Sequence, residues 1–410
     1  MKLLRNGIRA VFFICLLFTG AVFTLVAVLS AKISKNYKIN TGEIFSIQSL
    51  IPLTAEPVTA DAGTVPDKAG DRYEVDLKIF GLIPFSTVNV EVVDRTYVNV
   101  LGQPFGMRIY TDGVLVVDIN DVTSENGKVN PAKAAGIRKG DYILSVNGKK
   151  ISCNEELSEL VVASGGEKMK FEIMRENTKM YFNVKPVKDS SDGTYRLGIW
   201  IRDSSAGIGT LTFYSPSTGI MCGLGHGLCD SDTDELLKIE SGQMVSAEIL
   251  AVKKGKKGEP GELKGRFTYN VLSGVKLNSE CGIYGNAAGT ISGANLTQIA
   301  LRQEVRDGDA QILCTVEGDT PTLYSCKVKR HGNGSEQNLT VTVTDERLLE
   351  ITGGIVQGMS GSPIIQNGKL IGAVTHVLIE NPTSGYGIYA ERMLEESESA
   401  AKTAVKQKAS

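Results

Sequence analysis

The stretch Gly358-Met359-Ser360-Gly361-Ser362-Pro363 decides how this chain folds and what it can do. A serine nucleophile needs its hydroxyl on a sharp turn, with backbone N–H groups aimed at the developing oxyanion. Gly358 and Gly361 permit such a turn, so the amides of Gly358 and Ser360 are predicted to form an oxyanion hole. Residues 364–377 follow as an apolar pair, an Asn-Gly turn and an apolar strand. The stretch therefore predicts a nucleophile turn followed by a β-hairpin, with an unreactive glycine-rich turn as the alternative.

The partner base is easy to look for because the chain has only 3 histidines. His226 lies upstream, in Gly223-Leu224-Gly225-His226-Gly227, between short apolar runs. A neutral imidazole can take the proton of a serine hydroxyl and return it to a leaving amine. His331 lies in a polar turn and His376 lies in the strand after the nucleophile hairpin. His226 is therefore the predicted general base.

A metal site is the competing interpretation of the same segment. Cys222, His226 and Cys229 supply three potential zinc ligands within eight residues. Structural zinc needs a fourth ligand, and no second paired cluster is present in the sequence. The two cysteines could instead form a Cys222–Cys229 disulfide or remain as free thiols. We expect no metal and no cofactor for the serine chemistry.

A third catalytic group would orient the imidazole and stabilise its charged form. Seven aspartates lie between His226 and Ser360, and the order of residues alone does not select among them. They are Asp230, Asp232, Asp234, Asp307, Asp309, Asp319 and Asp345.

The chain around these residues, 188–395, consists of short Val-, Ile- and Thr-rich runs joined by glycine-rich turns. Many strands at this spacing predict a pair of barrels or sandwiches. The layout is similar to chymotrypsin-like peptidases, in which a Gly-x-Ser-Gly-x-Pro turn precedes a hairpin. The Lys-rich segment 253–264 is predicted to be a solvated hairpin tip. The polar tail 396–410 is predicted to be frayed.

Residues 96–187 predict a separate compact domain. A helix starts at Pro131 and stops at Gly136, and Asn147-Gly148 forms a tight hairpin turn. The run from Pro131 to Gly148 resembles a PDZ domain. The resemblance implies a carboxylate-binding loop at Phe105, Gly106, Met107 and Arg108, and a peptide ligand added to a sheet edge. A module that only docks on its neighbour is the alternative.

The N-terminal region 1–31 predicts a membrane segment. Basic residues precede an uncharged stretch over 10–31, which is long enough to cross a bilayer as a helix. A signal peptide cleaved after Ser30 is the alternative, and we favour an uncleaved anchor with the C-terminal bulk exported. Residues 32–95 predict a linker followed by a short β-like region over 73–93.

Composition excludes some partners and leaves other questions open. The chain of 410 residues suits two folded domains. Its formal net charge is -2, with 44 basic and 46 acidic residues mixed along the sequence, so we expect no nucleic-acid partner. The 7 cysteines do not fix the redox compartment, because a chain of this length folds without disulfides.

Three blocks give the sequence a more specific resemblance. They are Gly223-x-Gly225-His226-Gly227-x-x-Asp230, Lys254-Gly255-x-x-Gly258-x-Pro260-Gly261-Glu262-Leu263-x-Gly265 and Ile355-Val356-Gln357-Gly358-Met359-Ser360-Gly361-Ser362-Pro363. Found in this order, they resemble the stage IV sporulation protein B peptidases of endospore-forming bacteria. The expected fold is mainly β: an N-terminal membrane helix, a PDZ domain and a chymotrypsin-like double β-barrel serine peptidase domain.

The resemblance also implies an activity and a place. Such a serine endopeptidase lies between the forespore and mother-cell membranes, processes itself and cleaves a membrane protein that restrains an intramembrane protease. A late mother-cell sigma factor then matures. His226 and Ser360 match the family's catalytic pair, and its aspartate falls at Asp345, unusually near the serine. The non-enzyme alternative is a tethered adaptor with an inert peptidase-like domain, in which the PDZ groove acts.

The strand after the nucleophile hairpin forms a wall of the primary specificity pocket in chymotrypsin-like folds. Thr375 and His376 fall there. A histidine in such a pocket can hydrogen-bond an amide side chain, so the sequence predicts a preference for Gln before the scissile bond. The alternative is a core or strand-edge histidine.

Overall fold

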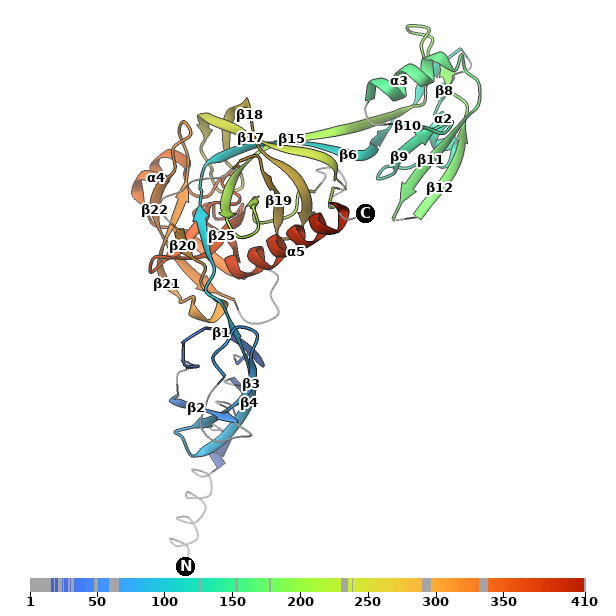
Figure 1. The fold of residues 1–410 in the computed structure, drawn as a ribbon. Helices are drawn as coiled ribbons and strands as arrows, with labels where there is room; N and C mark the ends of the chain where they lie inside the picture. The colour runs from blue at the N-terminus through green and yellow to red at the C-terminus, as the bar shows by residue number, and fades with distance from the viewer. Residues whose placement is uncertain are drawn as a thin grey trace, which may run out of the picture. The chain divides into compact units, whose positions relative to one another are not determined.

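The computed structural model separates the chain into two units, each described here by itself. The first unit comprises Met1–Thr96, Leu301–Val305 and Arg330–Asn338, and the second contains the rest (Figure 1). The structure describes residues 16–17, 19–20, 24, 26–28, 30, 33–47, 51–58, 66–125, 127–151, 154–176, 178–229, 235–237, 239–289, 296–331 and 338–408.

The first unit holds a four-stranded sheet with the order β1-β4-β3-β2. Its strands are β1 (Asn36–Asn40), β2 (Leu53–Val58), β3 (Arg72–Ile79) and β4 (Ile83–Val93). Alternate residues of β3 and β4 point inward, and Val75, Leu77 and Val90 are buried in a core of its own. The predicted β-like region over 73–93 is confirmed, but the predicted linker is wrong where β1 and β2 complete the sheet.

The predicted membrane segment 10–31 lies largely outside the described residues. Within the described parts of the chain, we find no helix that is both long and apolar enough to cross a membrane.

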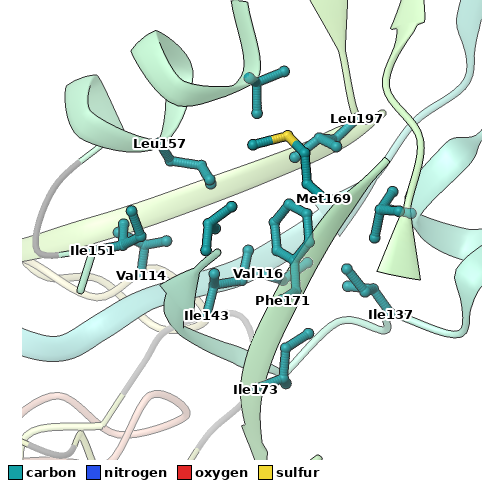
Figure 2. Packing of buried hydrophobic residues seen from close by; sticks show 14 residues of the cluster. Val114, Val116, Ile137, Ile143, Ile151, Leu157, Met169, Phe171, Ile173 and Leu197 are labelled. Carbon is teal, nitrogen blue, oxygen red and sulfur yellow. The ribbon is translucent and has the colours of Figure 1, made fainter. Parts of the chain in front are cut away.

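The PDZ region is a small sheet closed by two helices, with one apolar core. Figure 2 shows side chains from several strands and from α3 pointing toward one another, among them Val114, Ile143, Leu157 and Phe171. Its elements are β7 (Val122–Ser124), β8 (Gly127–Val129), α2 (Pro131–Ala135), β9 (Tyr142–Val146), β10 (Lys149–Lys150), α3 (Asn154–Ala163), β11 (Met169–Arg175), β12 (Thr178–Val184), β13 (Val187–Lys188) and β14 (Tyr195–Arg196).

The predicted ends of the first PDZ helix are confirmed. The side chain of Asn130 accepts a hydrogen bond from the amide of Lys133, and Pro131 occupies the first turn. Gly136 ends the helix with a left-handed φ of 100°. The Asn147-Gly148 turn has positive φ at both residues, as its hairpin requires.

The first barrel is a ring of six strands, in the order β6-β17-β18-β19-β16-β15, which closes because β15 also pairs with β6. The strands are β6 (Pro104–Ile119), β15 (Ile199–Ser215), β16 (Ile220–Gly223), β17 (Ile239–Lys253), β18 (Glu262–Ser279) and β19 (Gly282–Ala287). β5 (Tyr97–Val100) pairs with β15 outside the ring, and β20 (Leu296–Gln298) pairs with β5.

The PDZ domain is an insertion in this first barrel. The pairing of β6 with β15 runs from Pro104 opposite Thr210, in the barrel, to Ile119 opposite Ile199, in the PDZ domain. The PDZ core forms around this second end of the two strands. The predicted boundary at 96 coincides with the end of the first unit, but the predicted PDZ domain over 96–187 starts too early, because the first half of β6 belongs to the peptidase barrel and β5 pairs with β15 of that barrel.

The predicted PDZ carboxylate-binding loop is wrong for the same reason. Phe105 and Met107 are buried in the barrel core, with 0% and 2% of their surface exposed. Gly106 and Arg108 pair with β15 on one side and β17 on the other. Because both edges of this strand are occupied, residues 105–108 cannot accept a peptide strand.

The second barrel is closed by the strand order β21-β22-β23-β26-β25-β24. Its elements are β21 (Gly308–Cys314), β22 (Thr322–Arg330), β23 (Leu339–Val343), α4 (Glu346–Thr352), β24 (Pro363–Gln366), β25 (Lys369–Val377), β26 (Ser384–Tyr389) and α5 (Ala390–Lys408). The short helix η1 (Arg302–Glu304) belongs to the first unit. β24 and β25 form the predicted hairpin after the nucleophile turn, and two closed barrels confirm the expected double-barrel fold.

The polar tail is a helix rather than a frayed end. α5 packs on β16 and β19 of the first barrel and on β25 and β26 of the second. Met393, Ser397 and Ala400 on its inner face are buried, while charged residues occupy the other faces. This amphipathic pattern over 390–408 explains why a mostly polar sequence is ordered.

Candidate active site

The nucleophile turn joins α4 to β24 and has the predicted tight backbone. Gly358 and Gly361 have φ values of 99° and 96°, which side-chain-bearing residues rarely adopt. The amide of Met359 donates to Val356 O at 3.1 Å, and that of Gly361 donates to Val374 O at 2.8 Å. Among the described residues, the amides of Gly358 and Ser360 have no acceptor. They are the two N–H groups that the sequence proposes for an oxyanion hole.

The hydroxyl of Ser360 is directed at the neighbouring strand. It donates to the carbonyl oxygen of Thr375 in β25 at 2.6 Å. This bond holds the side chain beside the turn in a defined rotamer. For the serine to act as a nucleophile, its hydroxyl must rotate from Thr375 to a base.

Residues 224–227, called the base loop here because they hold the predicted base His226, follow β16 and have an unusual backbone. Leu224 and Gly225 have consecutive positive φ values of 72° and 69°. Positive φ at a buried leucine is strained and persists only where the surroundings hold it. A Cβ at Gly225 would lie 3.1 Å from Val374 O and 3.3 Å from Thr375 Cγ2. The loop therefore lies against the same part of β25 that accepts the Ser360 hydroxyl.

His226 is oriented by its own backbone neighbour. Its Nδ1 lies 2.8 Å from the carbonyl oxygen of Gly227. Since a carbonyl only accepts, the neutral ring carries its proton on Nδ1, which leaves Nε2 unprotonated as a base. Burial, together with the nearby His376, lowers the pKa of His226 from 6.5 to about 4. The imidazole is therefore neutral at physiological pH.

His376 lies directly on the base. The two imidazole rings have their centroids 4.4 Å apart, at an interplanar angle of 32°. His376 follows Thr375, whose carbonyl oxygen accepts the Ser360 hydroxyl. The structure thus brings His226, Ser360 and His376 together at β25. Partial burial also lowers the pKa of His376.

Two threonines of β15 fasten the nucleophile turn to the first barrel. The Thr210 hydroxyl donates to Gly358 O at 2.8 Å, and its amide donates to Ser360 O at 2.8 Å. Its carbonyl oxygen accepts from the amide of Leu224 at 3.2 Å. The Thr212 hydroxyl donates to Gly361 O at 2.7 Å. Thr210 is therefore hydrogen-bonded to Gly358 of the predicted oxyanion hole, to Ser360 and to Leu224 of the base loop.

The second sequence block, Lys254 to Gly265, also contacts the nucleophile turn. Leu263 N donates to Gln357 O at 2.8 Å, and Gln357 N donates to Gly261 O at 2.9 Å. A Cβ at Gly358 would lie 2.9 Å from Leu263 Cβ. The prediction of a solvated hairpin tip holds for exposed Lys256 and Glu259, but the base of the hairpin supports the turn.

Comparison with known proteins identifies both domains. Residues 193–394 match the family model for SpoIVB peptidase S55, and residues 86–185 match the model for a PDZ domain. The chain is a PDZ-containing, SpoIVB-like serine endopeptidase.

Two solved structures are distantly similar to this peptidase. One is the PDZ domain of an SdrC-like protein from Listeria monocytogenes, at 22% identity and a TM-score of 0.19, covering 22% of this chain and 87% of that one. The other is the thermostable serine protease AL20 from an extremophilic microorganism, at 12% identity and a TM-score of 0.29, covering 48% and 91%. Both TM-scores are too low to carry an argument.

The structure does not bring Asp345 to the base of this peptidase. Its carboxylate caps α4 by accepting from the amide of Arg347 at 3.1 Å, and also accepts from that guanidinium and from Ser325 N. The Arg347 guanidinium holds the pKa of the carboxyl well below its usual range. Asp345 is thus engaged in a helix cap and an ion pair rather than in a triad.

No other carboxylate is joined to His226 within the described part of the chain. Asp230, Asp232 and Asp234, the aspartates nearest to it in sequence, lie outside the described residues. In this geometry Gly227 O takes the orienting role that a triad carboxylate would have.

The two cysteines beside the base are not joined. Neither Cys222, which is buried, nor Cys229, which is exposed, is part of a disulfide. Cys222 Sγ is directed at Phe213 O at 3.4 Å, inside the first barrel. The alternative of a Cys222–Cys229 disulfide is therefore wrong.

Sequence reasoning missed Thr210 and Thr212. They are buried and lie on one face of β15, with Leu211 between them. The alternation Thr-Leu-Thr is the only local signal, and it is common in strands. Their role depends on bonds to residues almost 150 positions later in the chain.

Proposed function

We propose that Ser360 is the nucleophile and His226 the general base of this serine endopeptidase. One observation carries the assignment. The amides of Gly358 and Ser360 in the nucleophile turn have no acceptor among the described residues, and the base loop packs on β25, the strand whose Thr375 O accepts the Ser360 hydroxyl. This combination meets the needs of nucleophilic catalysis with an oxyanion hole.

The reaction follows from these positions. The Ser360 hydroxyl turns from Thr375 O, its oxygen attacks the peptide carbonyl carbon and its proton passes to His226 Nε2. The amides of Gly358 and Ser360 bind the carbonyl oxygen as it becomes an oxyanion. When the C–N bond breaks, Nε2 returns the proton to the leaving amine. Water then repeats both steps on the acyl-enzyme and releases the acid.

The substrates and the place of action are the second part of the proposal. The peptidase processes itself and cleaves a membrane-bound regulator of an intramembrane protease, between the forespore and mother-cell membranes. An uncleaved anchor over 10–31 holds it there, and its PDZ domain takes a peptide ligand. The name of the matching family and the apolar stretch of the sequence support this.

Thr375 and His376 are the residues that we propose select the substrate side chain before the scissile bond. The Thr375 carbonyl oxygen accepts the Ser360 hydroxyl, and the His376 ring rests on His226. His376 is otherwise exposed, so a substrate side chain can reach its free edge. We propose that it favours Gln before the scissile bond. A peptide library should lose this preference with His376→Ala, and an unchanged preference would remove His376 from the pocket.

The test of the proposed function is self-cleavage by the purified full chain, comparing wild type with Ser360→Ala. Ser362→Ala is the matched control, because the Ser362 hydroxyl is buried and has no hydrogen-bond partner among the described residues. Fragments that form in wild type and control, and disappear in Ser360→Ala, are expected. Equal fragmentation in all three would contradict the assignment. A wild type that cleaves neither itself nor a peptide library would favour the adaptor whose PDZ groove acts alone.

A further inference from the structure

The turn between β3 and β4 exposes three neighbouring apolar side chains. Phe80 is 63% exposed, Leu82 is 82% exposed and Ile83 is 59% exposed. Pro84 and Phe85 continue the run, so residues 80–85 contain no charge. Single exposed apolar residues are ordinary on a protein surface, but a contiguous apolar tip marks an interaction site.

The backbone of this tip is held in place. Phe80 N donates to Pro52 O at 3.0 Å, and Leu82 N donates to Ile79 O at 3.1 Å. Phe80 has a positive φ of 52°, which is unusual for a bulky residue. The sheet thus presents the phenylalanine to solvent at a cost in backbone strain, and such strain is found where a site requires it.

Strand register places the tip at the end of the sheet from which the chain enters. β1 runs parallel to β4, with Asn36 opposite Asn89 and Asn40 opposite Val93. The Asn89 amide donates to Lys35 O at 2.8 Å. Six residues back along β4 from Asn89 lies Ile83, about 20 Å away in an extended strand. Six residues back in sequence from Asn36 is Ser30, which falls at the end of the predicted membrane segment 10–31.

The surrounding charges suit a lipid headgroup layer. Lys35 directly precedes β1, and its backbone carbonyl accepts from the amide of Asn89, six residues along β4 from Ile83. Lys78, next to the tip, forms an ion pair with Glu56. An apolar end followed by basic residues is the pattern of segments that lie in a membrane interface, and aromatic residues are enriched there.

We propose that Phe80, Leu82 and Ile83 insert into the interfacial layer of the bilayer that the segment 10–31 enters. This second contact rests on the proposed anchor. A single helix leaves the attached domain free to swivel, whereas an inserted hairpin tip fixes the end of the four-stranded sheet against the lipid surface.

The experiment reconstitutes the full chain in liposomes and reads tryptophan fluorescence. Trp200 is the chain's single tryptophan, so Trp200→Phe removes the background. Leu82→Trp then places a probe at the tip, and Ile44→Trp is the matched control. Ile44 is 92% exposed and follows the other end of β1, so neither substitution disturbs the core. The quencher is a phospholipid brominated just below its headgroup.

We expect the probe at position 82 to shift its emission to the blue and to lose most of its intensity with the brominated lipid. The probe at position 44 should keep its emission wavelength and its intensity. Equal quenching at both positions, or none at position 82 in chains that float with the liposomes, would overturn the inserted tip. A blue shift without quenching would show that protein covers the tip instead. Failure of the chain to float would overturn the anchor as well as the tip.

Discussion

The two barrels of this peptidase each carry one loop of the proposed catalytic pair, Ser360 and His226, but they are built differently along the chain. The second barrel is formed by one almost continuous stretch of sequence, from Gly308 to Tyr389, and its nucleophile turn leads directly into a local hairpin. The first is interrupted between β6 and β15 by the PDZ domain. Its base loop needs strands that lie on both sides of the insertion.

The difference shows how an insertion of this size is tolerated. β6 and β15 remain paired beyond the barrel, so the insertion closes a ladder that already holds its two ends together. Loop-closure entropy grows slowly with length, which makes such an insertion inexpensive. One consequence is that β15 packs on the PDZ core at one end and, through Thr210, hydrogen-bonds the nucleophile turn at the other.

The largest predicted loss of stability comes from a side chain placed between the two barrels at Gly361. A Cβ at Gly361 would lie 2.0 Å from Thr210 O and 2.5 Å from Leu224 N. Gly361→Ala should cost more than about 3 kcal/mol of stability and remove activity, because backbone must move. Gly368→Ala shares the positive φ but meets nothing within 4 Å, so it should cost only about 1–2 kcal/mol. Denaturant unfolding compares them, and equal losses would contradict the tight contact.

Next in size is the loss of the Thr210 hydroxyl, which is bonded to Gly358 O. Thr210→Val should lower kcat by about 10- to 100-fold with little change in KM, because the oxyanion hole loses its position. Thr210→Ser should restore most of it. Thr212→Val is the matched variant, since its hydroxyl bonds Gly361 O, away from the hole amides. A similar fall in kcat for both would show general loosening rather than positioning.

Asp345 tests whether the second barrel supplies more than the nucleophile. Asp345→Ala should lower stability by about 1 kcal/mol, because it removes the N-cap of α4. Thermal unfolding measures the loss, and Asp345→Asn, which can still cap, should recover most of it. At temperatures where the variants are folded, kcat should fall far less than it does for His226→Gln. A fall as large as that of His226→Gln would place Asp345 in the catalytic unit.

The smallest effect concerns pH. Because burial and His376 lower the pKa of His226 to about 4, the acid limb of kcat/KM should have its midpoint near pH 4 rather than near 6.5. Removing the neighbouring positive charge with His376→Gln favours the protonated base and should raise the midpoint. Burial is the larger cause, so the rise should stay below about one pH unit. A midpoint near 6.5 in wild type would mean that His226 is solvated.

Local patterns in the sequence predicted what is local in the structure. The nucleophile turn with its hairpin, the helix from Pro131 to Gly136 and the Asn147-Gly148 turn each depend on neighbouring residues. His226 was predicted as the base because histidines are few and a glycine-rich turn surrounds this one, and its role is part of the proposed function.

What the sequence did not predict depends on distant pairing. Phe105 and Met107 are inward residues of any apolar strand, and only β15 and β17 show that this strand belongs to a barrel. The second block, Lys254 to Gly265, looked solvated because its lysines are exposed, while its glycines allow close approach to Gln357. α5 looked frayed because its inner face is formed largely by Ser and Ala.

The central claim is that Ser360 of one barrel and His226 of the other act as one unit. The most direct test is a double-mutant cycle on peptide hydrolysis with Ser360→Ala, His226→Gln and the pair. Each single change should lower kcat by about 10⁴- to 10⁶-fold, and the double variant should be no slower than the slower single variant. Losses that multiply in the double variant would contradict the claim, because they would show that the two residues act independently.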